Sequence, residues 1–208
     1  MTDILNCIML FQITKRITDV IISTAGIILL IPFYPFIALA IKINSKGPAI
    51  IKLDRVSSGK TIKVYKFRTM VKNAHLLKKN LIPLNERSDG PFFKIKNDPR
   101  ITKIGKILRK LRIDEFPQLI NVLKGELSLV GPRPHEPEET VLYPEKYKSL
   151  ISEKSGITGL SQVNGASGLP FLKELEFDDY YAKHKSLTFD LKILLKTIYI
   201  LLFDPTGV

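Results

Sequence analysis

Cysteine and histidine, the side chains that most often build disulfide and metal sites, are scarce in this 208-residue sequence. The single cysteine, Cys7, excludes an internal disulfide framework and is compatible with a reducing compartment. The three histidines, His75, His135 and His184, lie far apart, and none has a cysteine or second histidine at ligand spacing. A zinc site is therefore not expected, because zinc is held by clustered cysteine and histidine ligands.

Internal repeats and low-complexity segments are also missing, so residues 1–208 are expected to form one domain. Negative charge is in deficit, since 20 Asp and Glu stand against 32 Lys and Arg and leave a net charge of +12. Such an excess calls for a polyanionic partner: nucleic acid, an anionic membrane surface or phosphorylated substrates. Nucleic acid is disfavoured, because neither a groove-entering element nor stacking aromatics at regular spacing can be found.

Charged residues are missing altogether from Val20–Ile41, a run of 22 residues that is long enough to cross a bilayer core as a helix. Pro32 and Pro35 interrupt it, and since proline removes a backbone donor and clashes with the preceding turn, a sharp bend is expected there. Basic residues flank the run at Lys15, Arg16, Lys42, Lys46 and Lys52. The positive-inside rule places both flanks in the cytoplasm, so residues 15–42 are predicted to be a re-entrant membrane helix broken at proline.

Two other interpretations of this run stay open. A secretory signal peptide has the same basic start and apolar run, and Ala38-Leu39-Ala40 imitates a cleavage site, although the apolar part is longer than usual. A straight helix that crosses the bilayer once also fits, because prolines are tolerated in membrane helices.

Two short apolar runs, Ala49–Ile51 and Ile62–Tyr65, are typical of strands, and turn formers from Ser57 to Lys60 lie between them. A β-hairpin is therefore predicted. Lys66 and Arg68 extend the second strand, in which cationic and apolar residues alternate. From this pattern alone, a solvated strand edge guarded by cations fits as well as a binding surface.

Helical patterns dominate the rest of the chain. Val71–Lys79 has helical character, and a loop rich in turn formers follows it. Ile107, Leu108 and Leu111 share one face of a further helix. The final segment, Asp178–Phe203, interleaves lysines with a wide apolar face, which suits an interfacial helix on anionic lipid and also an ordinary core-packing helix. The sequence therefore predicts an α+β fold that is mostly α.

An acidic pair, Asp114 and Glu115, restarts the helical pattern. Asp is a favoured N-cap, Glu in a first turn suits the helix dipole, and Pro117 fits only in a first turn. The expected buried face of this helix consists of Leu119, Ile120 and Leu123. Because Arg109 and Arg112 lie just upstream, Asp114 is expected to stay ionised near neutral pH, as a nucleophile or metal ligand. An ordinary capping Asp with a first-turn Glu would show the same spacing.

A basic turn follows the acidic pair. Pro132 and Pro134 fix the backbone on either side of Arg133, so that its guanidinium is aimed at low entropic cost. A phosphate is the ligand that such a side chain suits, and an exposed turn arginine remains the alternative. The glycines in residues 156–168 are too irregular for a Walker loop, so no nucleoside triphosphate fold is implied.

Three ordered blocks of the sequence carry a resemblance that covers almost the whole chain. They read GPAIIKLDRVSSGKTIKVYKFRTM, IDEFPQLINVLKGELSLVGPRP and GITGLSQVNG. Together they resemble the monotopic bacterial phosphoglycosyl transferases, which initiate surface polysaccharide and glycan assembly. Three blocks in fixed order are far more specific than any one motif.

The resemblance implies transfer of a sugar 1-phosphate from a UDP-sugar to a polyprenyl (undecaprenyl) phosphate, with release of UMP. It implies that Asp114 is the nucleophile of a covalent phosphosugar intermediate and that Glu115 is its partner. The implied cofactor is Mg²⁺, or Mn²⁺, bound at Asp114 to neutralise the reacting anions. The substrate phosphates are expected to bind at Lys66, Arg68, Arg109 and Arg133.

The family's membrane segment is a re-entrant helix broken at a Ser-Pro pair, and here Pro32 takes the proline position while Ile31 replaces the serine. The resemblance implies a location at the cytoplasmic face of the bacterial inner membrane. The small hairpin and amphipathic interfacial helices would surround a cytoplasmic catalytic core. An anionic membrane is an expected partner, nucleic acid is not, and a homodimer stays open. The alternative function is a non-catalytic basic adaptor at the membrane surface.

Overall fold

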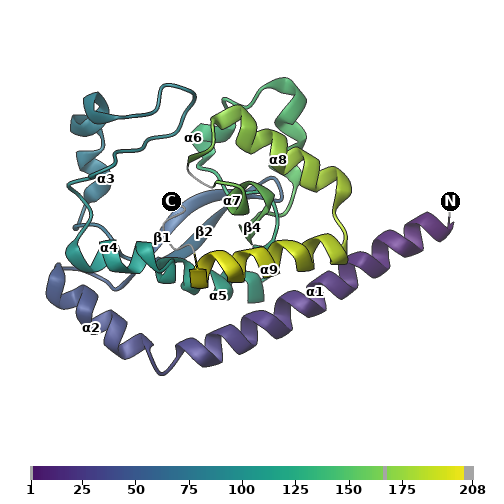
Figure 1. Ribbon diagram of the computed structural model, residues 1–208, viewed down its shortest axis with the longest axis horizontal. Helices are drawn as coiled ribbons and strands as arrows, with labels where there is room; N and C mark the ends of the chain where they lie inside the picture. Colours follow the sequence, from purple (N-terminus) through teal and green to yellow (C-terminus); the bar gives the residue numbers. More distant parts are fainter. Residues whose placement is uncertain (1, 166–167, 204–208) are drawn as a thin grey trace.

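The computed structural model describes residues 2–165 and 168–203, and Figure 1 shows that the molecule is mostly helical. The helices are α1 (Thr2–Leu30), α2 (Tyr34–Asn44), α3 (Ala74–Leu77), α4 (Lys103–Lys110), α5 (Leu119–Leu123), α6 (Pro137–Thr140), α7 (Leu160–Val163), α8 (Phe171–His184) and α9 (Leu187–Phe203). The 3-10 turns are η1 (Lys79–Leu84), η2 (Ile113–Gln118) and η3 (Glu145–Ser152). The strands are β1 (Ile50–Ser57), β2 (Lys60–Phe67), β3 (Ser128–Val130) and β4 (Gly156–Thr158). The predicted fold class, mostly α with a small hairpin, is confirmed.

α1 and α2 form a bent pair, with an angle of 64° at the break between them. Pro32 lies in this break, and because its nitrogen carries no proton it cannot continue the helical hydrogen-bond ladder. Pro35 lies in the first turn of α2, a position that tolerates the missing donor. The first proline therefore coincides with the bend, whereas the second is accommodated inside a helix.

Among the described residues, no single helix is both long and apolar enough to cross a membrane. Met9–Leu30 and Tyr34–Asn44 meet that criterion only together, as a bent pair, by length and composition. Both helices expose large apolar side chains, including those of Ile28, Leu29, Phe36 and Leu39. Re-entrant insertion stays a prediction.

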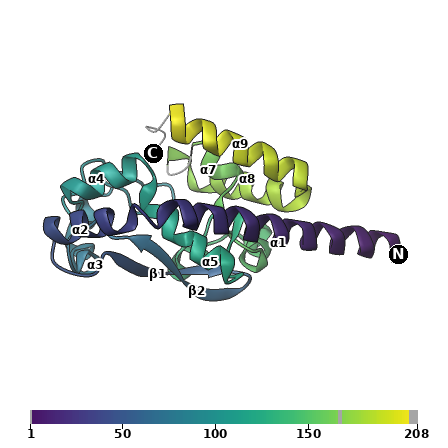
Figure 2. The same cartoon turned by 90° about the horizontal axis from the view of Figure 1, so that it is seen from below.

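The basic start of the predicted membrane segment contacts the folded body. Lys15 Nζ donates to Asp190 (2.5 Å) and to the carbonyl oxygen of Val130 (2.9 Å). Arg16 donates to two carbonyl oxygens at the end of α5 (2.5 and 2.7 Å), and two groups of β3 donate to Asp19 (2.8 and 3.0 Å). In Figures 1 and 2, α1 crosses the body here and projects beyond it toward the N-terminus. Residues predicted as membrane flanks therefore also dock α1 on α5, β3 and α9.

The predicted β-hairpin is confirmed and is longer than expected. β1 and β2 pair antiparallel along their whole length, with Ile50 opposite Phe67. Ser58 (φ 51°) and Gly59 (φ 71°) form the turn, and two positive φ angles match the twist that favours two-residue hairpins. Val64 and Phe67 of β2 are each 1% exposed and lie in different buried clusters, so the two faces of the hairpin both contribute to the core.

A second sheet, the parallel pair of β3 and β4, was not predicted. Ser128 pairs with Gly156 and Val130 with Thr158, so two segments far apart in sequence meet. The largest buried apolar cluster contains Val64, Val122, Leu127, Leu129, Val130, Val163, Tyr181 and Ile193. This core therefore joins the hairpin, both sides of β3, and the C-terminal helices.

Two helical predictions need correction. Within Val71–Lys79 only α3 is α-helical, because Asn73 adopts a left-handed conformation (φ 61°) that delays the helix start. Asp178–Phe203 is not one helix, since α8 ends before Lys185 and α9 begins after Ser186. Both helices contact α7, while α8 also packs against η3 and α9 against β3 and β4.

α4 buries less of its apolar face than predicted. Thr102 caps it, because its hydroxyl oxygen accepts a hydrogen bond from the amide of Gly105 (2.9 Å). Leu108 is buried, whereas Ile107 and Leu111 are exposed. Only a narrow stripe of α4 therefore packs against the body.

Candidate active site

The acidic pair lies in η2, which begins after a reversal of the chain at Arg112. This residue is left-handed (φ 54°, ψ 18°), and η2 starts directly after it. Asp114 therefore lies inside the first turn, and Pro117 lies within the 3-10 turn. The prediction that Asp114 is a helix N-cap is wrong, because the residue that precedes the turn is Arg112, whose backbone is not extended as in an ordinary cap.

The winding of η2 also changes which residues of the next helix are buried. Asn121 and Val122 are the buried residues of α5, whereas Ile120 is exposed. A 3-10 turn has about 3.0 residues per turn instead of 3.6, so the apolar face predicted for a continuous α-helix is rotated. Asn121 ties α5 to the hairpin, because it accepts from the amide of Tyr65 (3.0 Å) and donates to the carbonyl oxygen of Lys63 (2.8 Å).

Asp114 is a buried carboxyl, 9% exposed, in η2, which packs against β2. Burial raises its pKa to about 6, and the charge of Glu115 acts in the same direction. The positive charges of Lys66 and Arg109 oppose this rise. Asp114 is therefore mostly ionised at pH 7, as predicted, but it is a weaker acid than an ordinary aspartic acid.

Glu115 has a different environment. Burial disfavours its charge, but a hydrogen bond from Lys66 (2.5 Å) and the charges of Arg133 and Arg112 hold the pKa of Glu115 below its usual range. Its side chain is 37% exposed. Neighbouring residues thus form one carboxylate neutralised by a lysine and one buried carboxylate beside it.

Two of the predicted phosphate-binding arginines are engaged with protein groups. Arg109 donates from Nε to the hydroxyl of Thr69 (2.9 Å); burial lowers the pKa of Arg109, and the charge of Asp114 opposes this. Arg68 is buried and donates to the carbonyl oxygens of Ser45 (2.6 Å) and Lys46 (2.9 Å). Arg68 therefore holds the α2–β1 connection, while Arg109 lies beside Asp114.

Glycine is required where this connection passes Arg68. Gly47 has a φ of 130°, and a Cβ atom there would lie 2.0 Å from a guanidinium nitrogen of Arg68. The close approach lets the arginine bind both neighbouring carbonyl groups.

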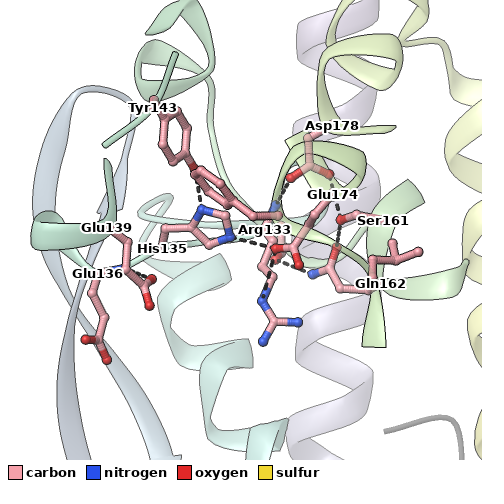
Figure 3. A network of polar contacts seen from close by, with 12 residues as sticks. Arg133, His135, Glu136, Glu139, Tyr143, Ser161, Gln162, Glu174 and Asp178 are labelled. Carbon is pink, nitrogen blue, oxygen red and sulfur yellow. Dashed lines mark hydrogen bonds and ion pairs between the residues drawn. The ribbon is translucent and has the colours of Figure 1, made fainter. Parts of the chain in front are cut away.

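Arg133 lies at the edge of a buried polar network that sequence reasoning missed (Figure 3). Its amide donates to Asp178 (3.0 Å), and its Nε lies 3.6 Å from Glu174. Glu174 also interacts with His135 Nε2 (2.7 Å), whose other ring nitrogen contacts the hydroxyl of Tyr143. The only sequence signal was the spacing of two acids four residues apart, which ordinary solvated helices also show.

The two acids of α8 differ in acidity as the acidic pair of η2 does. Burial disfavours the charge of Glu174, but the hydrogen bond with His135 and the charge of Arg133 hold its pKa below the usual range. Burial raises the pKa of Asp178 to about 6, against hydrogen bonds from Ser161 and the Arg133 amide. Both acids are almost fully buried.

Comparison with known proteins identifies the family. Residues 10–204 match the sequence model described as bacterial sugar transferase. The chain belongs to this family. The resemblance noted in the sequence is therefore confirmed at the level of the family.

Similar members of the family carry more specific names. The chain is 40% identical over 201 residues to a UDP-glucose:undecaprenyl-phosphate glucose-1-phosphate transferase of Klebsiella pneumoniae, covering 90% of this chain and 40% of that protein. It is 38% identical over 192 residues to an undecaprenyl-phosphate galactose phosphotransferase of Salmonella typhimurium, with the same two shares. It is 35% identical over 190 residues to the exopolysaccharide production protein ExoY of Sinorhizobium fredii, covering 89% of this chain and 84% of that protein. The chain thus spans about two fifths of the first two relatives and most of the third.

The carboxylates of this family member fit a divalent cation that is shared with a substrate. Across residues 2–165 and 168–203, no group of three or more His, Cys, Asp or Glu side chains is placed to hold a metal ion. Asp114 and Glu115 nonetheless supply oxygen ligands among cations. Mg²⁺ is commonly bound through one or two carboxylates together with substrate phosphates, so the donor set suits it.

A pocket of about 340 Å³ lies beyond the chain reversal at Arg112. It is lined by Arg112, Gln162, Val163, Asn164, Gly165, Lys196 and Ile200. Lys196 donates to Asn164 (2.7 Å) across it, so α9 and the end of α7 share this hollow.

Proposed function

We propose that the protein transfers a sugar 1-phosphate from a UDP-sugar to a polyprenyl phosphate and releases UMP. The observation that carries this proposal is Asp114, a buried carboxylate with a pKa of about 6 between the charges of Lys66 and Arg109. The printed names of two relatives describe sugar phosphate transfer to undecaprenyl phosphate, which supports the same substrate classes. The role fits the first membrane step of polysaccharide synthesis.

The transfer proceeds in two displacements at one phosphorus atom. An Asp114 carboxylate oxygen attacks the sugar-bearing β-phosphorus of the UDP-sugar, and the bond from that phosphorus to the bridging oxygen breaks, so that UMP leaves with the electron pair. A phosphate oxygen of the polyprenyl phosphate then attacks the same phosphorus. The bond to Asp114 breaks, which regenerates the carboxylate and yields the polyprenyl diphosphate sugar.

The nucleophile and the phosphate that it attacks are both negatively charged. The cations around the acidic pair supply positive charge that reduces their repulsion. Lys66, Arg109 and Arg133 are assigned to the substrate phosphates, because preorganised positive charge stabilises developing negative charge in a transition state. Glu115 accepts a hydrogen bond from Lys66 (2.5 Å) and is assigned to orient that lysine. Arg68 is assigned to the α2–β1 connection, since its donors already bind carbonyl oxygens.

A Mg²⁺ or Mn²⁺ ion bound by Asp114, with Glu115 and the diphosphate, would neutralise charge on the substrate. The proposal predicts that EDTA abolishes UMP release while the circular dichroism spectrum and unfolding midpoint stay the same. Full turnover in EDTA would remove the metal from the proposal.

The bent α1–α2 pair is proposed to enter the cytoplasmic leaflet of an anionic bacterial inner membrane and leave on the same side. Its exposed apolar residues and the net charge of +12 support this location. A cysteine-accessibility tag at either end should react only from the cytoplasm. Labelling of an N-terminal tag from the periplasm would favour a span that crosses once.

The test of the reaction is a single-turnover assay without acceptor. The protein is mixed with a panel of UDP-sugars and Mg²⁺, and UMP and intact mass are measured. One UMP per protein and a phosphosugar adduct on the peptide that contains Asp114 are expected, and Asp114→Asn should abolish both. The matched control is Asp54→Asn, which alters an exposed carboxylate paired with Lys63 on the hairpin.

Two results would contradict the reaction. UMP release only in the presence of polyprenyl phosphate, with no adduct, would indicate direct attack by the acceptor. Membrane binding without UMP release from any UDP-sugar would favour a non-catalytic adaptor.

A further inference from the structure

Two buried acids of α8 converge on Arg133, although neither takes part in the proposed displacements. Glu174 is 1% exposed and Asp178 is 2% exposed. They are four residues apart, so they share one face of the helix. Burying two carboxylates is unfavourable unless each is compensated, so their partners indicate why they are there.

Asp178 fixes the backbone of the basic turn. One of its oxygens accepts from the amide of Arg133 (3.0 Å), and the other accepts from the hydroxyl of Ser161 (2.7 Å). The same turn is tied to β4, because Gly131 donates to Thr158 (2.9 Å). The main chain at Arg133 is therefore held from two directions.

Glu174 acts on the side chain of the same residue. Its Oε1 lies 2.7 Å from His135 Nε2 and 3.6 Å from Arg133 Nε. His135 is in turn buried against Tyr143, so the position of the Glu174 carboxylate is fixed from behind. In Figure 3 the guanidinium of Arg133 extends out of this network. Its side chain is 36% exposed, so the charge can reach a ligand.

Restraint of Arg133 before a ligand arrives lowers the entropic cost of binding that ligand. An unrestrained arginine side chain samples many rotamers, and a ligand that needs one of them must order the rest of the side chain. A buried carboxylate beside Nε removes part of that freedom before a ligand arrives.

We propose that Glu174 is a positioning residue that acts through Arg133: the buried carboxylate holds the guanidinium at the exposed edge of this network, where it receives a phosphate of the UDP-sugar. This inference rests on the proposed function. The competing explanation is that Glu174 only satisfies buried His135 and supports the fold, in which case its loss would not depend on Arg133.

A double-mutant cycle separates these explanations. Glu174→Gln keeps the shape of the side chain and removes its charge, and Arg133→Ala removes the residue it is proposed to hold. We expect Glu174→Gln alone to lower kcat/KM for the UDP-sugar about 10-fold, mainly through KM, because a misplaced binding group commonly costs one to two orders of magnitude. In the Arg133→Ala background the same change should alter kcat/KM less than about 2-fold. Equal losses in both backgrounds would overturn the proposal.

Two further variants guard against a folding defect. Glu174→Asp keeps the charge with a shorter reach, so it should fold and show a smaller loss than Glu174→Gln. Asp190→Asn is the matched control, since Asp190 is a buried acid of α9 that binds Lys15 and Tyr181 instead of Arg133. Its kcat/KM should stay within about 2-fold of the wild type. A loss as large as that of Glu174→Gln would show that any buried acid of this region has the same effect.

A second measurement does not depend on turnover. In full-length protein labelled with ¹⁵N-arginine, the Nε–H group of Arg133 should exchange slowly and be ordered in the wild type. It should become mobile in Glu174→Gln and Glu174→Asp. Unchanged Arg133 dynamics in both variants would overturn the positioning role even if sugar transfer fails, and loss of order without UMP release in the wild type would refute only the proposed function.

Discussion

Two pairs of acids lie in the body of this molecule. Their comparison shows that a carboxyl group, whose burial is unfavourable, can be buried for a chemical role in one place and for a structural role in another. Asp114 and Glu115 are adjacent in a 3-10 turn, whereas Glu174 and Asp178 are one helical turn apart on α8. In each pair burial raises the pKa of the aspartic acid to about 6. In each pair a basic partner keeps the pKa of the glutamic acid below its usual range.

The pairs differ in what the aspartate oxygens contact. Both oxygens of Asp178 accept hydrogen bonds, from Ser161 and from the Arg133 amide. Asp114 has a hydrogen bond from its own backbone amide and is influenced by the charges of Lys66 and Arg109. A carboxylate whose oxygens are bound by a hydroxyl and by the amide of another segment is a structural anchor, whereas one influenced mainly through charge stays available as a nucleophile.

The largest expected effect tests this division directly. Asp114→Asn should lower the rate of UMP release at least about 1000-fold, because removal of a covalent nucleophile commonly costs several orders of magnitude. Asp178→Asn should cost about 10-fold, since Arg133 is displaced while the nucleophile remains. Rates of UMP release and far-ultraviolet circular dichroism should be recorded for both. Similar losses in the two folded variants would erase the distinction between the pairs.

The second prediction concerns stability. Asp114→Asn should raise the free energy of unfolding at high pH, although the same change abolishes activity. The pKa of Asp114 rises from the ordinary 3.8 to about 6, so the folded state binds this proton more tightly than the unfolded state. The stability that follows is fully present below pH 3.8 and is lost as the pH rises through 6, a difference of about 3 kcal/mol. Asp114→Asn removes the titration.

Urea unfolding of both proteins between pH 4 and pH 8 measures this difference. Relative to the wild type, Asp114→Asn should gain about 2.5 kcal/mol of unfolding free energy from pH 4 to pH 8, because part of the full difference is already lost at pH 4. Asp54→Asn serves as the control, because its carboxylate is exposed. A difference between variant and wild type that does not change with pH would show that burial does not raise the pKa of Asp114.

A smaller effect is expected from the lysine that joins the first pair. Lys66→Met should lower kcat/KM on the order of 10- to 100-fold, because a preorganised charge is lost. The pKa of Asp114 should rise further, so the acid limb of the pH–rate profile should move to higher pH. Lys63→Met is the matched control, since Lys63 lies on the same strand and pairs with exposed Asp54. An unchanged acid limb in Lys66→Met would show that the charge of Lys66 does not affect the pKa of Asp114.

The features predicted correctly from sequence were those set by local chemistry. Turn formers between two apolar runs predicted the hairpin, and Pro32 predicted the break after α1. The acidic pair was located by its motif. Its surroundings were not, because the left-handed Arg112 converts the expected α-helix into a 3-10 turn.

Features that depend on contacts between distant parts of the chain could not be predicted from the sequence. β3 and β4 are three residues long and pair in parallel, so neither carries a periodic signal. Arg68 and Arg109 were both expected to bind substrate phosphates, yet Arg68 donates to carbonyl oxygens and Arg109 donates to the hydroxyl of Thr69. Glu174 looked like any helical acid. The partners of a buried charge depend on packing and not on neighbours in sequence.

The smallest expected effect concerns the bonded oxygen of the second pair. Ser161→Ala should destabilise the protein by about 1.5–3 kcal/mol, because a hydrogen bond to a charged group is lost while Asp178 stays buried. The pKa of Asp178 should rise above 6, so the destabilisation should be largest above that pH and should shrink as the acid is protonated. The loss of UMP release should be only a few fold, since Asp178 still holds the Arg133 amide.

Ser23→Ala is the matched control, because Ser23 is also fully buried but its hydroxyl has no partner within the described part of the chain. That variant should be neutral or slightly more stable at every pH. If both serine variants gave the same pH-independent change in unfolding midpoint, the hydroxyl of Ser161 would not bind a charged Asp178, and Asp178 would not be the anchored aspartate of the comparison.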